Sequence, residues 1–564
     1  MPLELVFQPP ASPLGNLWLA ALVASLPIIA MVVTLAGLRW KAYLAGPFSW
    51  FIAFLVAVTA FQMPWQMALA TSAEGFVYGI FPIVWILLSA IWMYEVTVTS
   101  GRFDDLRRTF FLISDDPRVL AILISFCFGG LLEALAGYGA PVAITAAMLV
   151  AIGFAPLRAA LIALLANTVP VAFGAVGLPV MEAARVGGFD NVLDISPITG
   201  RLTAMLCLVV PFLLLMVIDG KRGLKQCWPF GLVVGISFGV TKWIVSALPL
   251  YNLTEMIASV VTVGVALVFL RLWRPTGGEE ATARIGIPVD PTLESSAPKP
   301  ATSATEASLT PARIVMALVP YILVIIAFGI AAIPAVKQSL VTADLHLDWP
   351  LLEGLRTAAG DVAANHSYAF KWASSPGLLL ALVAITSGLI YKMSLGQIFG
   401  VLWTNIKKMR FAMLTIGSVV ALAYVMGDSG QTLTLGSLIA GAGIVFPFLS
   451  PVLGWLGTYV TGSDTSANIL FSKLQATVGE QISPGSHLGT HDMQALLVGA
   501  SASGGVVGKM ISPQSLTVAA TAIGIVGAES TILRRIFGWS LVLLALLCLL
   551  AGLMSTPVLS WLLP

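Results

Sequence analysis

The sequence predicts an all-α polytopic membrane protein with about 12 to 16 membrane segments, in two inverted-topology repeats that contain broken or re-entrant helices. Composition predicts the class. Of the 564 residues, 58% are apolar and only 10% are charged, whereas a soluble domain carries about 25% charged residues. The mean hydropathy is +0.95. Apolar runs separated by short polar loops recur along almost the whole chain, so a soluble fold is excluded.

A helix that spans a membrane needs ~20 mostly apolar residues. The candidate spans are residues 17–37, 43–62, 75–97, 119–136, 159–180, 202–218, 228–247, 255–273, 313–335, 376–391, 411–426, 434–449, 491–508, 512–528 and 536–559. Several of these candidate spans are short or contain Gly and Pro, so the number of membrane segments is predicted only as a range.

Basic residues orient these spans, because short loops rich in Lys and Arg stay in the cytoplasm. A consistent topology results when every basic cluster is cytoplasmic, and it puts both termini outside. The clusters contain Arg39, Lys41, Arg102, Arg107, Arg108, Arg118, Lys221, Arg222, Lys225, Lys407, Lys408, Arg410, Arg534 and Arg535.

The chain divides at a polar stretch. Residues 274–312 are rich in Pro, Ser, Thr, Ala and Glu, a composition that cannot bury a core, so we expect a disordered cytoplasmic linker. Residues 1–225 form the expected first repeat and 313–564 the second. Residues 226–273 are expected to be connecting transmembrane helices.

Each repeat contains two polar, Gly-rich interruptions. They lie at residues 131–141 and 166–180 in the first repeat, and at 457–468 and 500–515 in the second. In the second member of each pair, Gly174 and Pro179 have the same spacing as Gly508 and Pro513. Paired interruptions in halves of opposite topology are typical of the binding site of a secondary transporter.

Three charges lie deep within apolar surroundings: Glu133, Asp464 and Lys509. Each costs at least ~2.5–3.5 kcal/mol at the bilayer centre, so each is a candidate for function. Structural alternatives stay open. Glu133 could be capped by a neighbouring helix, Asp464 could be a helix N-cap, and Lys509 could extend along the helix to the membrane surface.

Small polar residues at the four interruptions are the remaining candidates for a binding site. Freed backbone groups, hydroxyls and amides at a helix break can hold a carboxylate, an ion or a hydroxylated ligand, although such residues also simply pack helices together. The candidates are Gly137, Tyr138, Gly139, Asn167, Thr168, Ser463, Thr465, Asn468, Ser501, Ser503 and Gln514.

The sequence contains no motif that is typical of the other classes of protein considered. There is no Walker A loop and no basic patch with interleaved aromatics for nucleic acid. His487 and His491 have helical spacing but no third ligand nearby, so we expect no metal site and no cofactor other than a coupling ion. No catalytic constellation stands out, and we expect no enzyme activity. The oligomeric state stays open.

Five segments carry a resemblance to a known family: GNLWLAALVASLPI (15–28), FCFGGLLEALAGYGAPVAITAAMLV (126–150), ANTVPVAFGAVGLPV (166–180), LGWLGTYVTGSDTSANILF (453–471) and GGVVGKMISPQSL (504–516). They resemble the bacterial L-lactate permease family, which includes glycolate permeases. The resemblance implies a multi-pass secondary transporter of the cytoplasmic membrane that moves lactate, and often glycolate, together with protons.

The expected function is therefore import of L-lactate by proton symport with alternating access, with D-lactate and glycolate as further substrates. Half-helix N-termini at 137–141 and 461–465, assisted by Lys509, would hold the substrate carboxylate. Glu133 or Asp464 would carry the proton. The alternative is a Na⁺-coupled carboxylate transporter. A channel, a membrane enzyme and a sensor are more distant alternatives.

Overall fold

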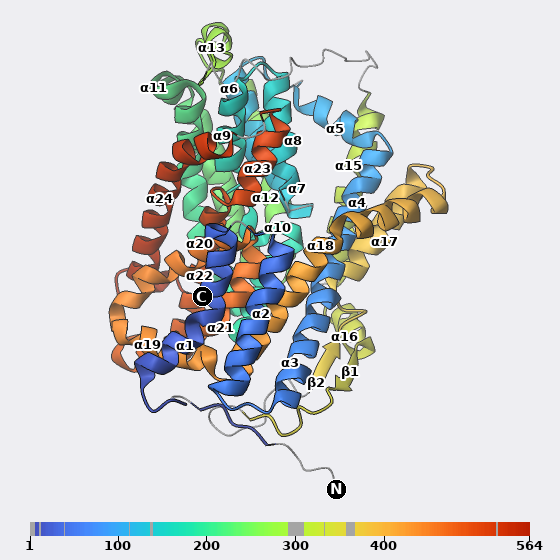
Figure 1. Cartoon of the computed structure of the whole chain (residues 1–564). Helices are drawn as coiled ribbons and strands as arrows, with labels where there is room; N and C mark the ends of the chain where they lie inside the picture. Colours follow the sequence, from blue (N-terminus) through green and yellow to red (C-terminus); the bar gives the residue numbers. More distant parts are fainter. Residues whose placement is uncertain are drawn as a thin grey trace.

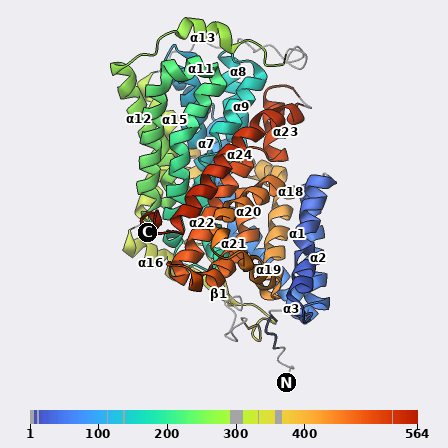
Figure 2. The same ribbon diagram turned by 90° about the vertical axis from the view of Figure 1, so that its left-hand side faces the viewer.

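The computed structural model describes residues 6–564 except 11–12, 39, 112, 136–138, 291–309, 332, 357–366 and 526–527. Within these residues, eleven helices are long and apolar enough to cross a membrane, and one further pair, Pro156–Ala166 with Val171–Gly187, is bent by 62°. Figures 1 and 2 show the helices running mostly along one axis. The predicted class, an all-α multi-pass membrane protein, is confirmed.

One group of helices comes from the start of each half of the chain. It comprises α1 (Leu17–Val32), α2 (Ala42–Thr59), α3 (Trp65–Tyr78), α4 (Trp85–Thr99), α5 (Arg102–Phe111), α15 (Pro311–Ala331), α17 (Pro376–Ile390) and α18 (Leu395–Asp428). Helix α18 packs through glycines on α3 and on the segment that follows it, because a side chain at Gly75 or Gly79 would collide with the α18 backbone.

A helical hairpin enters the molecule from the end where α13 (Gly278–Ile285) lies, at the top of Figure 1. Helices α6 (Pro117–Ile122) and α7 (Gly129–Leu135) run inward, and α8 (Ala140–Ala151) returns. Both hairpin ends are tied to the α13 segment: Arg118 donates to the Thr276 carbonyl at 2.7 Å, and the Ala155 N–H donates to the Ile285 carbonyl at 3.0 Å. The hairpin therefore ends where it began and does not cross the molecule.

A second helical hairpin enters from the opposite end. It consists of α20 (Phe446–Thr461) and α21 (Asp464–Ile482), which are antiparallel because Gly457 faces Phe471 and Ala467 across the turn. It follows the short helix α19 (Gln431–Ile439), which Figure 1 shows at the end far from α13.

Each hairpin is followed by an interrupted helix. Helix α9 (Pro156–Ala166) leads into α10 (Gly174–Gly187), and α22 (Thr490–Lys509) leads into α23 (Pro513–Ala522). The helix ends in the two hairpin turns and in these two helices all fall inside the four segments where the sequence predicts interruptions. Whether the two halves are related as repeats stays a prediction.

Helix α11 (Ser196–Ser246) contains two predicted spans, 202–218 and 228–247, as one helical hairpin. The chain reverses at Gly220, where φ is +61°. Gly235 and Gly239 then pack against the Cys207 and Ala204 carbonyls of the first arm. Helices α12 (Thr254–Leu272) and α24 (Glu529–Met554) flank this hairpin.

The prediction of disorder across 274–312 is wrong for α13. Ala281 and Ile285, four residues apart, form a buried face, and Arg284 donates to the Asp219 carboxylate at 2.7 and 2.8 Å. The ion pair with Asp219 raises the pKa of Arg284. The polar composition of residues 274–312 gives no indication of this short amphipathic helix. Residues 291–309 of the predicted linker lie outside the described residues.

The second polar stretch, 336–374, also contains regular structure. Helix α16 (Pro334–Ala343) precedes strands β1 (Leu345–Asp348) and β2 (Ser367–Phe370), which pair antiparallel with Leu345 opposite Phe370. Tyr368 anchors the strand pair by donating to the Phe81 carbonyl at 2.6 Å, and burial raises the pKa of Tyr368 to about 12.

Short 3-10 and π segments complete the helices. They are η1 (Val33–Gly37), η2 (Gly79–Val84), η3 (Leu123–Phe128), η4 (Val171–Phe173), η5 (Val192–Asp194), η6 (Tyr251–Leu253), η8 (Ala440–Val445), η9 (Ser483–Gly485) and η10 (Ser560–Leu562).

Candidate functional site

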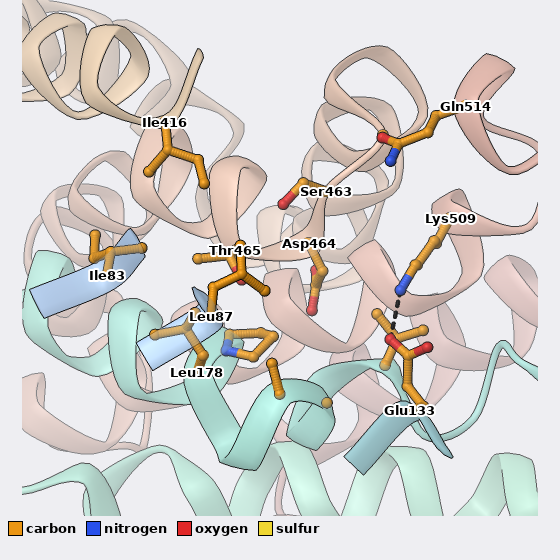
Figure 3. A pocket seen from close by; sticks show the side chains of 15 residues that line it. Ile83, Leu87, Glu133, Leu178, Ile416, Ser463, Asp464, Thr465, Lys509 and Gln514 are labelled. Atoms are coloured by element: carbon orange, nitrogen blue, oxygen red, sulfur yellow. Dashed lines mark hydrogen bonds and ion pairs between the residues drawn. The ribbon is translucent and has the colours of Figure 1, made fainter. Parts of the chain in front are cut away.

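A pocket lies where the turn of the second hairpin meets the end of α7 and both interrupted helices (Figure 3). Its volume is about 560 Å³, including the part open to solvent. One side is polar and the other is apolar. The lining residues are Ile83, Leu87, Glu133, Val171, Gly174, Ala175, Leu178, Pro179, Ile416, Gly462, Ser463, Asp464, Thr465, Lys509 and Gln514.

An ion pair joins the two halves of the chain at this pocket. The Lys509 ammonium at the end of α22 donates to Oε1 of Glu133 at 2.5 Å, and Figure 3 shows the two side chains pointing at each other. The Asn167 amide donates to the other oxygen, Oε2, of Glu133 at 2.9 Å. Glu133 is 2% exposed and Lys509 is 9% exposed. Burial of two charges this deep is costly unless each charge is matched and hydrogen-bonded, and both conditions are met here.

Asp464 is the pocket carboxylate that has no cationic partner within 4 Å among the described residues. Thr458 donates to its Oδ1 at 3.3 Å, and within the described part of the chain Oδ2 has no hydrogen-bond partner. The side chain is 3% exposed. A buried ionised oxygen without a donor is costly, and protonation removes that cost. Asp464 therefore has the surroundings of a group that can take up a proton.

Glycine at position 505 lets α22 approach this carboxylate. A Cβ on Gly505 would collide with Oδ1 of Asp464 and the hydroxyl of Thr458. A Cβ on Gly504 would likewise collide with the Pro451 carbonyl of α20, and a Cβ on Gly508 would collide with the Trp455 carbonyl of the same helix. The Gly-rich run in α22 thus packs the interrupted helix against the hairpin with no room for a side chain.

The turn of the second hairpin starts a helix inside the molecule. Gly462 has φ +74°, a conformation that glycine adopts without strain, and a Cβ there would also meet the Gln514 side chain. Ser463 then caps α21 by accepting from the Ser466 N–H at 3.3 Å. The first turn of α21 therefore places backbone N–H groups at the pocket, an arrangement that favours an anion.

The first interrupted helix carries backbone strain beside the pocket. Ala175, Val176 and Gly177 have consecutive positive φ values of 44°, 58° and 77°. A β-branched residue in this region is an outlier, and such strain is concentrated at functional sites. The Asn252 amide holds the turn by donating to the Val176 carbonyl at 2.9 Å.

Most of the predicted site residues lie at the pocket or directly behind its lining. Asn167 and Asn468 lie behind the lining, because each donates a hydrogen bond to a residue that lines it. Asn167 donates to Glu133, and the Asn468 amide donates to the Pro179 carbonyl at 3.1 Å. The predicted residues that line the pocket itself are Glu133, Ser463, Asp464, Thr465, Lys509 and Gln514.

Four other predicted residues do not line the pocket. Thr168, just after α9, donates to the Leu164 carbonyl of that helix, and Ser503 donates to the Gly499 carbonyl of its own helix. Ser501 is buried where α22 packs on α20, and Gly139, with φ +85°, starts α8 against Val518. Gly137 and Tyr138 lie outside the described residues.

Sequence reasoning missed the apolar wall of the pocket. Ile83 and Leu87 come from η2 and α4, Ile416 comes from α18, and Leu178 comes from α10. An apolar side chain in an apolar chain gives no signal of its own, so only the packing of α4 and α18 beside the interrupted helices identifies this wall.

Sequence reasoning also missed buried charges outside the pocket. Lys242 of α11 and Glu255 of α12 form an ion pair at 2.5 Å with both side chains fully buried. Lys242 lies inside the predicted span 228–247, and this position is the signal that could have identified it. Glu74 of α3 and Glu182 of α10 are also buried. Glu182 pairs with Arg185, whose guanidinium carbon lies 3.8 Å from the centre of the Tyr78 ring.

No group of three or more His, Cys, Asp or Glu side chains with metal-binding geometry occurs in the described part of the chain. His491 instead lies 3.9 Å from Asp194 with its side chain 63% exposed.

The fold and the pocket together define a multi-pass membrane protein with a polar, charge-lined site between interrupted helices. Residues 20–558 match the family model described as L-lactate permease. The chain belongs to the L-lactate permease family, as its sequence motifs predict.

Similar proteins match over nearly their full length. The glycolate permease GlcA of Escherichia coli K12 is 39% identical over 94% of both chains. The L-lactate permease of Bacillus subtilis 168 is 37% identical over 98% of both chains. The L-lactate permease of Escherichia coli K12 is 35% identical, covering 99% of this chain and all of the relative.

Proposed function

We propose that the chain is a secondary transporter that imports L-lactate, together with D-lactate and glycolate, across the bacterial cytoplasmic membrane by proton symport with alternating access. The observation that carries this proposal is the pocket in which Lys509 and two carboxylates, Glu133 and Asp464, meet between interrupted helices. The names of the relatives, lactate and glycolate permeases, support the substrate class.

The substrate carboxylate would bind between Lys509 and the first turn of α21. The ammonium supplies a positive charge and the helix start supplies N–H donors. Ser463 and Thr465 line the same part of the pocket, and their hydroxyls are suited to a 2-hydroxyl group. The apolar side chains of Leu87 and Leu178 would contact the short carbon skeleton.

Asp464 is the better candidate for the proton carrier. Glu133 already pairs with Lys509 and accepts from Asn167, whereas among the described residues Asp464 forms no ion pair within 4 Å and has only Thr458 as a donor. When Lys509 turns toward a substrate anion, its attraction for Glu133 weakens. A proton on Asp464 then offsets the added negative charge.

Charge balance supports coupling of one proton to one anion. A monocarboxylate brings one negative charge into a site shielded from water, and an uncompensated charge there is costly. One proton that enters with the anion leaves the net charge of the site unchanged. The transport step is then electroneutral, so a pH gradient drives it and the membrane potential does not.

Alternating access is supported by the opposed directions of the two hairpins. The α7–α8 hairpin enters from the α13 end and the α20–α21 hairpin enters from the other end. We infer that the two halves form an inverted pair, with the α13 end in the cytoplasm and both termini outside. Each hairpin would then cover the pocket from one side of the membrane.

Uptake of labelled L-lactate into proteoliposomes tests this function, with pH and Na⁺ gradients imposed separately. We expect accumulation driven by an inward proton gradient, and competition by D-lactate and glycolate. Accumulation that follows only the Na⁺ gradient would favour the alternative, Na⁺-coupled carboxylate transport. Equilibration without accumulation would indicate a channel and contradict the proposal.

A further inference from the structure

A second buried ion pair lies behind the pocket, at the first interrupted helix. The Lys242 ammonium donates to Oε1 of Glu255 at 2.5 Å and to the backbone carbonyl of Val169 at 2.7 Å. Both side chains are completely buried. This pair comes from α11 and α12, and the proposed transport mechanism does not use it.

The oxygen atoms around the Lys242 ammonium are of the kind that coordinate a Na⁺ ion. Val169 lies between α9 and α10, where the helix is interrupted, and carbonyls at such breaks coordinate Na⁺ in secondary transporters. Glu255 adds a carboxylate, and its Oε2 has no hydrogen-bond partner among the described residues. The ring of Phe173 lies 5.4 Å from the Lys242 nitrogen and covers it on another side.

This pair is close to the pocket along the chain. Asn167, which donates to Glu133, is only two residues before Val169, whose carbonyl accepts from Lys242. A cation at this position therefore stabilises the acidic side of the site. A Na⁺ ion there could leave during the cycle, whereas an ammonium tethered to α11 cannot.

We propose that the Lys242 ammonium permanently occupies the position of a coupling Na⁺ at the first interrupted helix and thereby makes transport independent of Na⁺. This inference rests on the proposed proton-coupled transport. It assigns the choice of coupling ion to one residue outside the substrate pocket. It also predicts that removal of the ammonium uncovers a Na⁺ site formed by Val169 and Glu255.

The test is Na⁺-dependent stabilisation of the purified full-length Lys242→Ala variant, measured without substrate. We expect NaCl to raise its Tm by about 2 °C or more relative to choline chloride, and wild type to show no difference between the salts. The double variant Lys242→Ala with Glu255→Gln is the matched control. It lacks the carboxylate ligand and should not respond to Na⁺.

A second readout is lactate uptake at fixed pH. Na⁺ should stimulate uptake by Lys242→Ala several-fold and leave wild type unchanged. Equal Tm values of Lys242→Ala in the two salts would overturn the inference, even if wild type shows proton-driven uptake. Absence of proton-driven uptake by wild type would instead contradict the proposed function.

Should Lys242→Ala fail to fold, Lys242→Ser provides a second variant, because its hydroxyl can still donate to a nearby oxygen. The same Na⁺ response is expected from it. If neither variant folds, lactate uptake by the wild-type protein in the two salts tests the inference. Equal uptake in NaCl and choline chloride supports the inference, and uptake that requires Na⁺ overturns it.

Discussion

Two buried Lys–Glu pairs in this chain have the same chemistry and the same 2.5 Å separation but different surroundings. Lys509 and Glu133 face a pocket, and the Lys509 side chain is 11% exposed. Lys242 and Glu255 are sealed, and a backbone carbonyl holds the ammonium from another side. An ion pair can exchange partners only where a ligand can reach it, and of these two pairs only Lys509 and Glu133 meet that condition.

The largest expected effect comes from Lys509→Ala. It leaves Glu133 buried without its cation, at a cost of about 3–5 kcal/mol, and removes the positive charge proposed for the substrate. We expect lactate uptake to fall about 100-fold or more. Lys473→Ala, at an exposed position, is the control and should transport normally. Full uptake by Lys509→Ala would remove this pair from the transport site.

Asp464→Asn should separate transport from proton coupling. The amide keeps the size of the side chain but cannot carry a proton. We expect accumulation driven by a pH gradient to fall about 10-fold or more, while exchange of internal for external lactate persists. Asp492→Asn, at an exposed position in the same half, is the matched control. Unchanged pH-driven accumulation in Asp464→Asn would assign the proton to another group.

Gly505→Ala should disturb the same carboxylate indirectly. The added methyl group collides with Asp464 and Thr458, so α22 or the hairpin must shift. Overpacking of this kind costs about 1–3 kcal/mol. We expect a lower Tm and a reduced maximal uptake rate. Gly485→Ala, which has open space around it, should behave like wild type, and equal behaviour of both variants would contradict the packing described for α22.

Asn167→Ala should have the smallest effect of the series. It removes one hydrogen bond to Glu133 and leaves the Lys509 pair intact. A hydrogen bond to a charged group contributes about 1.5–3 kcal/mol. Because Glu133 keeps its Lys509 partner, we expect only part of this energy to affect lactate binding, so that the KM for lactate rises roughly 10-fold or less. An effect larger than that of Lys509→Ala would mean that the amide, and not the ammonium, controls Glu133.

The sequence predicts the membrane class and the positions of the helix interruptions because both are local. Glycine, proline and polar residues within apolar runs identify the breaks, and the deep charges Glu133, Asp464 and Lys509 stand out against their neighbours. The contact between Glu133 and Lys509 joins residues 376 positions apart, and no local pattern can show that they meet.

The remaining features depend on tertiary packing. The return of α8 toward the α13 end, the apolar wall from Leu87 and Ile416, and the partner of Lys242 follow from how helices pack. The helix α13 was missed for a related reason, since its stability comes from Arg284 binding Asp219 of another helix. Composition alone therefore predicts disorder where a distant contact supplies order.

The central claim is that one proton enters with one lactate through a site that contains Asp464. The most direct measurement is the external pH of a weakly buffered suspension of proteoliposomes when L-lactate is added. Wild type should make the medium more alkaline as labelled lactate enters, in a ratio near one proton to one lactate, and Asp464→Asn should not. Entry of lactate into wild-type proteoliposomes without any change in external pH would contradict the claim.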